Sequence, residues 1–271
     1  TIQRSARPPK ASLTVSGNDP RPVVLILDYS SSMTEPLTNK PGTARFEEAL
    51  ATLVDLVGGG NLNGSRVILN VYGHRVKYIK ATDQMVENPL YATCFRKPIP
   101  PGTGALEDIE TEFEGTIGKP GVQDSFNKTI SNLRCSKPFG ITPLIKAITQ
   151  ALDASLKDSE GIVIVVTDGE ASDLNKDTRR DLEAALKKKS ATSVNIVAFD
   201  VTAQAAARKK VQDTFDPFKI RVSDAGQRDQ LFDQIVDLLG PRSYTVTGNN
   251  GQEVRTAALG TEVSDLTPAN D

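Results

Sequence analysis

Two short runs of uninterrupted apolar residues constrain the fold of this chain more than any other feature. Val23–Leu27 and Ile162–Val166 are rich in β-branched side chains, and an aspartate follows each run within two residues. A strand that is buried on both faces has this pattern, because neither face of it alternates with polar side chains. Such strands belong to parallel sheets that are covered by helices, so the sequence predicts an α/β fold.

Strand and helix patterns alternate along most of the chain. We expect further strands at 66–72, 194–200 and 220–222, and helices at 45–57, 122–133, 142–156, 179–188, 203–215 and 228–239. The two apolar runs fit between these elements as the remaining strands. This alternation predicts an open, mostly parallel, doubly wound sheet with helices on both faces, as in Rossmann-like folds.

Three stretches depart from that alternation. Residues 1–20 are a polar lead-in with at most one short strand, at 11–15. Residues 79–121 contain five prolines and five glycines, which favour turns, and we expect an elaborated loop with an edge strand near 109–113. Residues 241–271 look like two strands joined by a turn at 248–251. The sequence thus predicts a lead-in (1–20), an α/β domain (21–240) and a β-type tail (241–271), which is either an appendage or the start of a further domain.

Composition excludes some classes of partner. The chain has 271 residues, a net charge of −2 and no long basic block, which argues against nucleic acid. No apolar run approaches the roughly 20 residues of a membrane span, so we expect no insertion into a membrane. Cys94 and Cys135 would form one disulfide in an exported protein and would be free thiols in a cytosolic one. The sequence leaves both states open.

Polar side chains follow the first apolar run in the pattern D-x-S-x-S, formed by Asp28, Ser30 and Ser32. In open α/β sheets, ligands bind outside the carboxyl ends of the strands, which is where these residues fall. Asp168 follows the second run and is expected at the same edge. Thr142 lies within a G-x-T-P-L segment, where it suits the N-cap of a helix with Pro143 in the first turn.

Two carboxylates and three hydroxyls are therefore expected at one rim. Oxygen ligands of this kind suit Mg²⁺, with Mn²⁺ or Ca²⁺ as alternatives, and the absence of His and Cys from the set argues against zinc. The sequence predicts a divalent metal site made of Asp28, Ser30, Ser32, Thr142 and Asp168.

These three motifs, in this order, resemble the metal-ion-dependent adhesion site (MIDAS) of von Willebrand factor type A (VWA) domains. The resemblance covers about residues 20–240. It implies that the serines and Thr142 bind the metal directly, that Asp168 acts through water, and that an acidic group of a protein partner completes the coordination. It also implies a parallel sheet with one short antiparallel edge strand, and a last helix that in some relatives moves between two states.

Smaller features resemble bacterial members of the family: Val-Tyr-Gly-His-Arg at 71–75, Cys94, and the Gly-x-Thr-Pro-Leu segment at 140–144. This branch implies a secreted, periplasmic or cell-surface protein, although a cytoplasmic one is not excluded by the sequence. We therefore expect a non-enzymatic module for adhesion and protein–protein interaction.

Two other functions remain open from the sequence. Asp28 is also placed to act as the nucleophile of a metal-dependent phosphohydrolase or phosphotransferase, although enzymes of that kind carry a second Asp where this chain has Ser30. Alternatively, the chain is an intracellular assembly subunit coupled to an ATPase. The single histidine, His74, is expected to be a structural partner or a solvated loop residue rather than a pH switch or a base. A serine hydrolase is disfavoured because the G-x-S-x-G elbow is absent.

Overall fold

The computed structural model describes residues 12–16, 21–157, 159–201, 205–239, 243–247 and 253–258. The chain divides into two compact units. One comprises Pro20–Leu239, and the other combines Thr1–Asp19 with Gly240–Asp271.

The larger unit is built on a six-stranded sheet with the order β11-β10-β9-β2-β5-β8. The strands are β2 (Val23–Asp28), β5 (Arg66–Tyr72), β8 (Ile109–Thr116), β9 (Ile162–Thr167), β10 (Ser193–Phe199) and β11 (Arg221–Ala225). All neighbours pair in parallel except β8, which runs antiparallel to β5 at one edge. The expected mostly parallel sheet is confirmed, with its single antiparallel edge strand.

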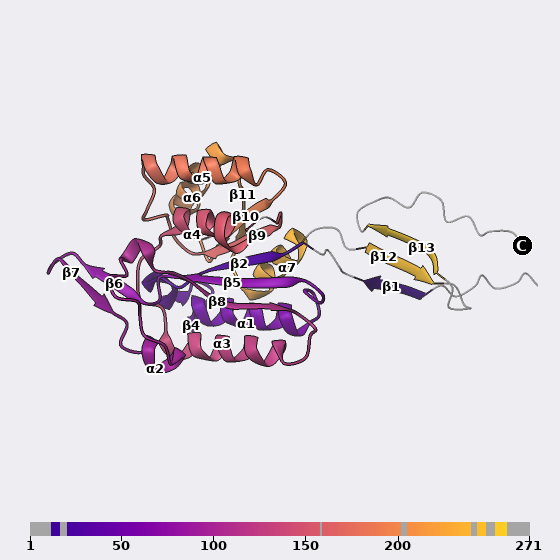
Figure 1. The fold of residues 1–271 in the computed structure, drawn as a ribbon, viewed down its shortest axis with the longest axis horizontal. Helices are drawn as coiled ribbons and strands as arrows, with labels where there is room; N and C mark the ends of the chain where they lie inside the picture. The colour runs from indigo at the N-terminus through magenta and orange to yellow at the C-terminus, as the bar shows by residue number, and fades with distance from the viewer. Residues whose placement is uncertain are drawn as a thin grey trace, which may run out of the picture. The chain divides into compact units, whose positions relative to one another are not determined.

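Helices cover both faces of this sheet (Figure 1). One layer consists of α1 (Arg45–Gly58), α3 (Val122–Ser136) and α7 (Arg228–Leu238), and the other of α4 (Leu144–Gln150), α5 (Lys176–Lys188) and α6 (Ala205–Phe215). Each layer packs against its face of the sheet as a separate hydrophobic core.

Strand β2 explains why its sequence is apolar at every position. Val23, Leu25 and Leu27 pack into the core that contains α1, whereas Val24 and Ile26 pack into the core that contains α4. Successive side chains of a strand point to opposite faces, so a strand between two cores has no polar face. The two apolar runs are confirmed as the central, doubly buried strands.

The stretch expected as an elaborated loop has regular structure of its own. It contains the hairpin β6–β7 (Val76–Ile79 and Gln84–Glu87) and the short helix α2 (Tyr91–Phe95), and it ends in β8. Val76, Tyr91 and Ile99 form a small third core. A disulfide between Cys94 and Cys135, with Cα atoms 5.8 Å apart, joins α2 to α3. The sequence left open whether Cys94 and Cys135 are free thiols or form a disulfide, and in the structure they form the disulfide.

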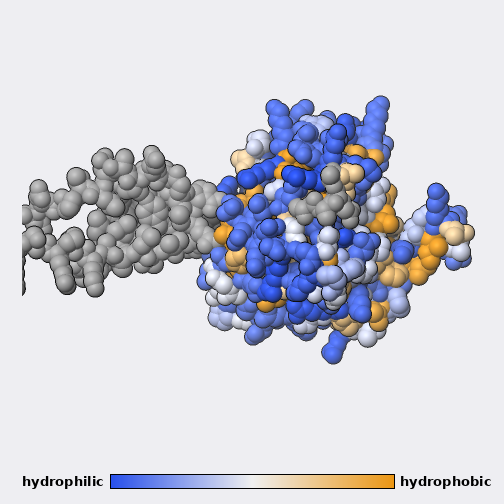
Figure 2. Space-filling view, turned by 180° about the vertical axis from the view of Figure 1, so that it is seen from behind, coloured by the Kyte–Doolittle hydropathy of each residue, from blue (hydrophilic) through white to orange (hydrophobic). Residues whose placement is uncertain are grey.

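The β6–β7 hairpin carries exposed apolar side chains. Tyr78 and Met85 face each other across its two strands, and both are more than 40% exposed. Among the described residues, the exposed large apolar side chains are Tyr78, Ile79, Met85, Leu90 and Leu174, so four of the five lie between residues 78 and 90. Figure 2 shows the hairpin projecting from the body of the unit, with apolar and polar surface side by side.

A second small hairpin joins the first motif to α1. Its strands are β3 (Pro36–Leu37) and β4 (Lys40–Ala44), which pair antiparallel with an irregular register. The sequence prediction did not include it, because two residues of strand are too short for a periodic pattern.

The smaller unit contains a three-stranded antiparallel sheet with the order β1-β12-β13. Its strands are β1 (Ser12–Ser16), β12 (Ser243–Thr247) and β13 (Glu253–Ala258), so the short strand expected at 11–15 and the two strands expected in the tail are present. The lead-in strand pairs with the tail, a pairing for which the sequence holds no local signal. The turn expected at 248–251 lies outside the described residues. Within the described part of the chain, no helix is long and apolar enough to cross a membrane.

Candidate metal centre

Asp28 stands at the carboxyl end of β2 and is fully buried. Its Oδ1 accepts a hydrogen bond from the backbone N–H of Ser30 at 2.9 Å, and its Oδ2 accepts one from the Thr167 hydroxyl at 2.6 Å. Thr167 is the last residue of the neighbouring strand β9. Both carboxylate oxygens of Asp28 are thereby fixed in position by the two central strands.

The hydroxyls of the first motif lie together at this edge. Ser30 Oγ is 3.1 Å from Ser32 Oγ, and the Ser32 hydroxyl donates a hydrogen bond of 2.8 Å to Asp168 Oδ1. Ser30 also forms a parallel bridge with Gly140, and Ser31 N–H donates to the carbonyl of Gly140 at 3.0 Å. The structure thus brings Asp28, Ser30, Ser32 and Asp168 together, as the sequence predicted, and sets the second motif directly beside the first.

The close approach of the two loops requires glycine. A Cβ added at Gly140 would lie 2.4 Å from the carbonyl oxygen of Val76, and one at Gly73 would lie 2.9 Å from Ser30 Cα. Gly73 also has a φ of +73°, a conformation that side chains with a Cβ rarely adopt. Two glycines therefore let three chain segments converge on the rim.

Thr142 does not take the position at the start of helix α4 that the sequence predicted. Helix α4 begins at Leu144, Pro143 occupies the N-cap position, and no side chain at that position caps the helix. The carboxylate of Asp173 instead accepts the N–H groups of Ile145 and Lys146, at 3.1 and 2.7 Å. The predicted N-cap role of Thr142 is therefore wrong, because an acidic side chain from another loop satisfies those donors. The hydroxyl of Thr142 does not cap the helix, and it is 3.9 Å from where a Cβ on Gly169 would stand.

Sequence reasoning missed the charged residues behind the site. Arg45, the first residue of α1, is buried and donates from Nη1 to Asp168 Oδ2 at 2.8 Å and from Nε to Asp200 Oδ2 at 2.9 Å. It also contacts the exposed Glu35 at 3.1 Å. One signal was available in the sequence: a cation at a helix N-terminus opposes the helix dipole, which favours a carboxylate partner.

Burial raises the pKa of Asp28 to about 6, and the neighbouring charge of Asp168 adds to the rise. Burial also raises the pKa of Asp168, against the opposing effect of its hydrogen bonds to Ser32 and Arg45. Two carboxyl groups that share a buried site disfavour each other's ionisation. A cation between them would remove this penalty.

The donor set fits a small, hard cation. Adjacent oxygens of an octahedral Mg²⁺ shell, with metal–oxygen distances of about 2.1 Å, lie about 3 Å apart. The distances from Ser30 Oγ to Ser32 Oγ and from Ser32 Oγ to Asp168 Oδ1, 3.1 and 2.8 Å, match that spacing. In the part of the chain that the structure describes, no group of three or more His, Cys, Asp and Glu side chains could hold a metal, so a metal here would depend on the hydroxyls.

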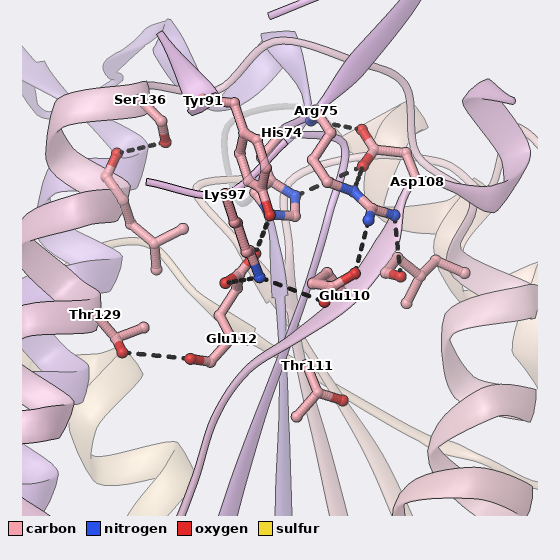
Figure 3. Close-up of polar contacts among 12 residues, drawn as sticks. His74, Arg75, Tyr91, Lys97, Asp108, Glu110, Thr111, Glu112, Thr129 and Ser136 are labelled. Atoms are coloured by element: carbon pink, nitrogen blue, oxygen red, sulfur yellow. Dashed lines mark hydrogen bonds and ion pairs between the residues drawn. The ribbon is translucent and has the colours of Figure 1, made fainter. Parts of the chain in front are cut away.

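His74 lies outside this donor set and is a structural partner, one of the two roles expected for it. Its ring is fully buried, Nε2 is 2.8 Å from Glu112 Oε1, and the ring packs edge-on against Tyr91. His74 Nδ1 has no hydrogen-bond partner among the described residues and lies 3.7 Å from Asp108 Oδ1. Figure 3 shows the ring enclosed by the segment 74–99 and β8.

His74 belongs to a cluster of six side chains (Figure 3). Its basic members are His74, Arg75 and Lys97, and its acidic members are Asp108, which precedes β8, and Glu110 and Glu112 of β8. Arg75 donates to Asp108 at 2.8 Å and to Glu110 at 2.6 Å, and Lys97 lies between Glu110 and Glu112. Asp108 further accepts the N–H groups of Arg75 and Val76. These contacts fasten the hairpin segment to the edge strand.

Comparison with known proteins finds similarity in structure but none in sequence. No family model and no curated protein matches the sequence. The solved structures that are similar include the pilus adhesin SpaC of Lactobacillus rhamnosus GG (TM-score 0.52, 14% identity, 87% of this chain and 34% of that one), the minor pilin PilB of Streptococcus sanguinis (0.52, 10%, 81% and 60%) and proximal thread matrix protein 1 of the mussel byssus (0.50, 12%, 83% and 49%). This chain spans about a third to three fifths of their lengths. At these identities the likeness shows the fold alone, a mostly parallel α/β sheet covered by helices on both faces.

Proposed function

We propose that this chain is a non-enzymatic, divalent-metal-dependent protein-binding module of the VWA type. Asp28, Ser30, Ser32, Thr142 and Asp168 would hold Mg²⁺, or Mn²⁺ or Ca²⁺, at the carboxyl edge of the sheet. The bound ion would supply an electrophilic centre that accepts a carboxylate from a protein partner.

One observation carries the proposal. Oxygen atoms from the first motif and from Asp168 lie 2.8 to 3.1 Å apart at a rim where β2 and β9 end together. They are held there by Thr167, by backbone bridges and by two glycines, so the spacing is built into the fold. Preorganised oxygen donors with only two carboxylates leave the metal electron-poor, which favours an external anion.

Two further features support a binding role rather than catalysis by Asp28. Asp28 is fully buried, whereas a phosphoryl-accepting nucleophile must reach a phosphate ester, which is much larger than a metal ion. The β6–β7 hairpin carries exposed apolar side chains and begins at Val76, whose carbonyl oxygen lies close to Gly140 of the second motif. Exposed apolar surface of this kind is what a protein partner would cover.

The disulfide and the structural neighbours support an exported location. Disulfides persist in oxidising compartments and are rare in the cytosol, so the bond between Cys94 and Cys135 disfavours an intracellular assembly subunit. Two of the neighbouring structures are a pilus adhesin and a minor pilin. We therefore propose a cell-surface or secreted adhesion module, of the bacterial branch that residues 71–75 and 140–144 resemble.

Titration calorimetry and thermal melts with Mg²⁺, Mn²⁺ and Ca²⁺ test the metal site. We expect saturating Mg²⁺ to raise the melting temperature, because a ligand at a hundred times its dissociation constant stabilises the folded state by about 2.7 kcal/mol. Asp28→Ala should abolish the rise, and Glu112→Gln, which changes a buried carboxylate outside the site, should retain it. No rise in the wild type, or an equal rise in Asp28→Ala, would refute the proposal.

Two experiments separate binding from the alternatives. Acetate is expected to displace water from the Mn²⁺-loaded protein, seen as reduced water-proton relaxation, while chloride at equal ionic strength has no effect. Turnover of a generic phosphate ester with Mg²⁺, if lost in Asp28→Asn, would instead establish the phosphohydrolase.

A further inference from the structure

Arg45 places a permanent positive charge directly behind the candidate metal centre. Its side chain is 7% exposed, and the guanidinium lies between Asp168 Oδ2 at 2.8 Å and Asp200 Oδ2 at 2.9 Å; both aspartate side chains are almost completely buried. Arginine stays protonated in proteins, so this charge is present at every pH at which the protein folds.

The position of Arg45 is unfavourable unless it serves these carboxylates. Burial removes the guanidinium from water, and the N-terminus of α1 presents a partial positive charge to it. Asp200, in turn, has a left-handed φ of 57°, which is uncommon for a residue other than glycine. That backbone directs its carboxylate to Arg45 and to Thr38, whose N–H and hydroxyl lie 3.1 to 3.2 Å away.

The contacts of Arg45 determine how Asp168 is presented to the site. Oδ2 of Asp168 is occupied by Arg45, and Oδ1 accepts the hydroxyl of Ser32. Asp168 therefore meets the rim through a serine hydroxyl rather than as a free carboxylate. A cation behind it also repels any second cation in front of it, since a unit charge acts over several ångströms in a buried site.

We infer that Arg45 is a positioning residue that acts as a built-in counter-cation: it orients Asp168 and weakens the site's affinity for a divalent ion. This inference rests on the proposed metal-binding function. It predicts effects of opposite sign from one substitution. Removing the charge should destabilise the metal-free protein, because Asp168 and Asp200 lose their partner, and should at the same time strengthen metal binding.

The test compares Arg45→Met with the wild type, measuring the dissociation constant of Mg²⁺ by calorimetry and the melting temperature in EDTA. We expect Mg²⁺ to bind on the order of tenfold more tightly to the variant, whose metal-free melting temperature is lower. Arg45→Lys keeps the charge and should bind Mg²⁺ nearly as the wild type does. If Arg45→Met does not fold, the double variant Arg45→Met/Asp200→Asn replaces it in the measurement of Mg²⁺ affinity. In the double variant only the Asp168 carboxylate has lost its arginine partner, because Asp200 is no longer charged.

Arg75→Met is the matched control, since Arg75 is likewise a buried arginine between two acidic side chains but lies in the cluster of Figure 3. It should lower the melting temperature and leave Mg²⁺ affinity unchanged. Unchanged or weaker binding in Arg45→Met, or tighter binding in Arg75→Met, overturns the inference while leaving the proposed function intact. If Mg²⁺ binds to Arg45→Met but not to the wild type, the inference is supported and metal binding by the natural protein is refuted. If Mg²⁺ binds to neither protein, both the inference and the proposed function are refuted.

Discussion

The hydroxyl of Ser32 donates a hydrogen bond of 2.8 Å to Asp168 Oδ1, joining two side chains that are 136 residues apart in the chain. This contact connects the loop after β2 with the loop after β9, and it exists only because those strands end at the same level of the sheet. It is the most direct measure of whether the rim is assembled.

Replacing Ser32 by alanine should remove one metal ligand and free Asp168 Oδ1. We expect Mg²⁺ to bind at least ten- to a hundredfold more weakly, as is typical when even an indirect partner of a metal site is lost. Calorimetry provides the measurement. Ser31→Ala changes the exposed serine of the same loop and should bind Mg²⁺ as the wild type does; equal losses in the two variants would contradict the assigned site.

Thr167→Val removes the hydroxyl that donates to Asp28 Oδ2 at 2.6 Å and leaves the shape of the side chain nearly unchanged. A buried carboxylate that loses a donor is costly, so the free energy of unfolding should fall by about 1–3 kcal/mol. Urea denaturation in EDTA measures this change. Thr149→Val is the control, because the Thr149 hydroxyl only bonds back to its own helix, and a comparable loss there would argue against a special role for Thr167.

Gly140→Ala tests the convergence of the two loops. The new Cβ would meet the carbonyl oxygen of Val76 at 2.4 Å, so the backbone must shift and displace the bridge to Ser30. We expect weaker Mg²⁺ binding and a lower melting temperature. Gly102→Ala has open space for its Cβ but a φ of +77°, and it should lower stability slightly without affecting Mg²⁺; an unchanged affinity in Gly140→Ala would contradict the model of the rim.

The acidic cluster around His74 predicts a pH dependence of stability. Burial raises the pKa of Glu112, but hydrogen bonds and charge from His74 and Lys97 outweigh it and hold that pKa below its ordinary value of 4.5. A carboxyl group whose pKa is lower in the folded state stabilises the protein above 4.5, and this contribution is lost as pH falls through the folded value. Thermal melts from pH 7 to pH 3 should therefore show a shallower acid decline in Glu112→Gln than in the wild type. Glu114→Gln, on the exposed part of the same strand, should follow the wild-type curve, and identical curves for all three proteins would refute the assignment.

The Cys94–Cys135 disulfide closes a loop across a sequence separation of 41 residues. Chain-entropy arguments give about 4 kcal/mol for a loop of this length, and measured values are commonly 2–4 kcal/mol. The double variant Cys94→Ser/Cys135→Ser should lose a similar amount of unfolding free energy in urea. Its Mg²⁺ affinity should be unaltered, because the bond joins α2 to α3 and not the rim. Reductant should destabilise the wild type and leave the double variant unaffected.

Much of the sheet was predictable because its central strands carry an unambiguous pattern. The range 66–72 coincides with β5, and the apolar run Ile162–Val166 ends one residue before β9 does, since an apolar run flanked by turn residues has few other solutions. Helix starts were less accurate. The start of α4 was placed two residues early because the competing cap, Asp173, lies in a loop almost thirty residues away. Helix α5 starts three residues before the predicted Arg179, at a capping box formed by Asn175 and Thr178.

The meeting of Asp28, Ser30, Ser32 and Asp168 at one edge of the sheet was predictable from the sequence, whereas the contacts of the charged residues behind them were not. Asp28 and Asp168 follow buried strands, and that position alone sets them at one edge. The roles of Arg45 and Asp200 depend on side chains 155 residues apart in the chain, which no local pattern encodes. The segment 79–121 was undetermined because its order comes from a disulfide and buried ion pairs instead of from periodic apolar residues.

That segment has its own small core, its own charge cluster and its own covalent bond, and it meets the sheet through the edge strand β8 and through α3. The segment is therefore stabilised separately from the two large cores that pack against the sheet. The tip of the β6–β7 hairpin contributes to neither of the two large cores, so substitutions there should leave the sheet and its stability nearly unchanged.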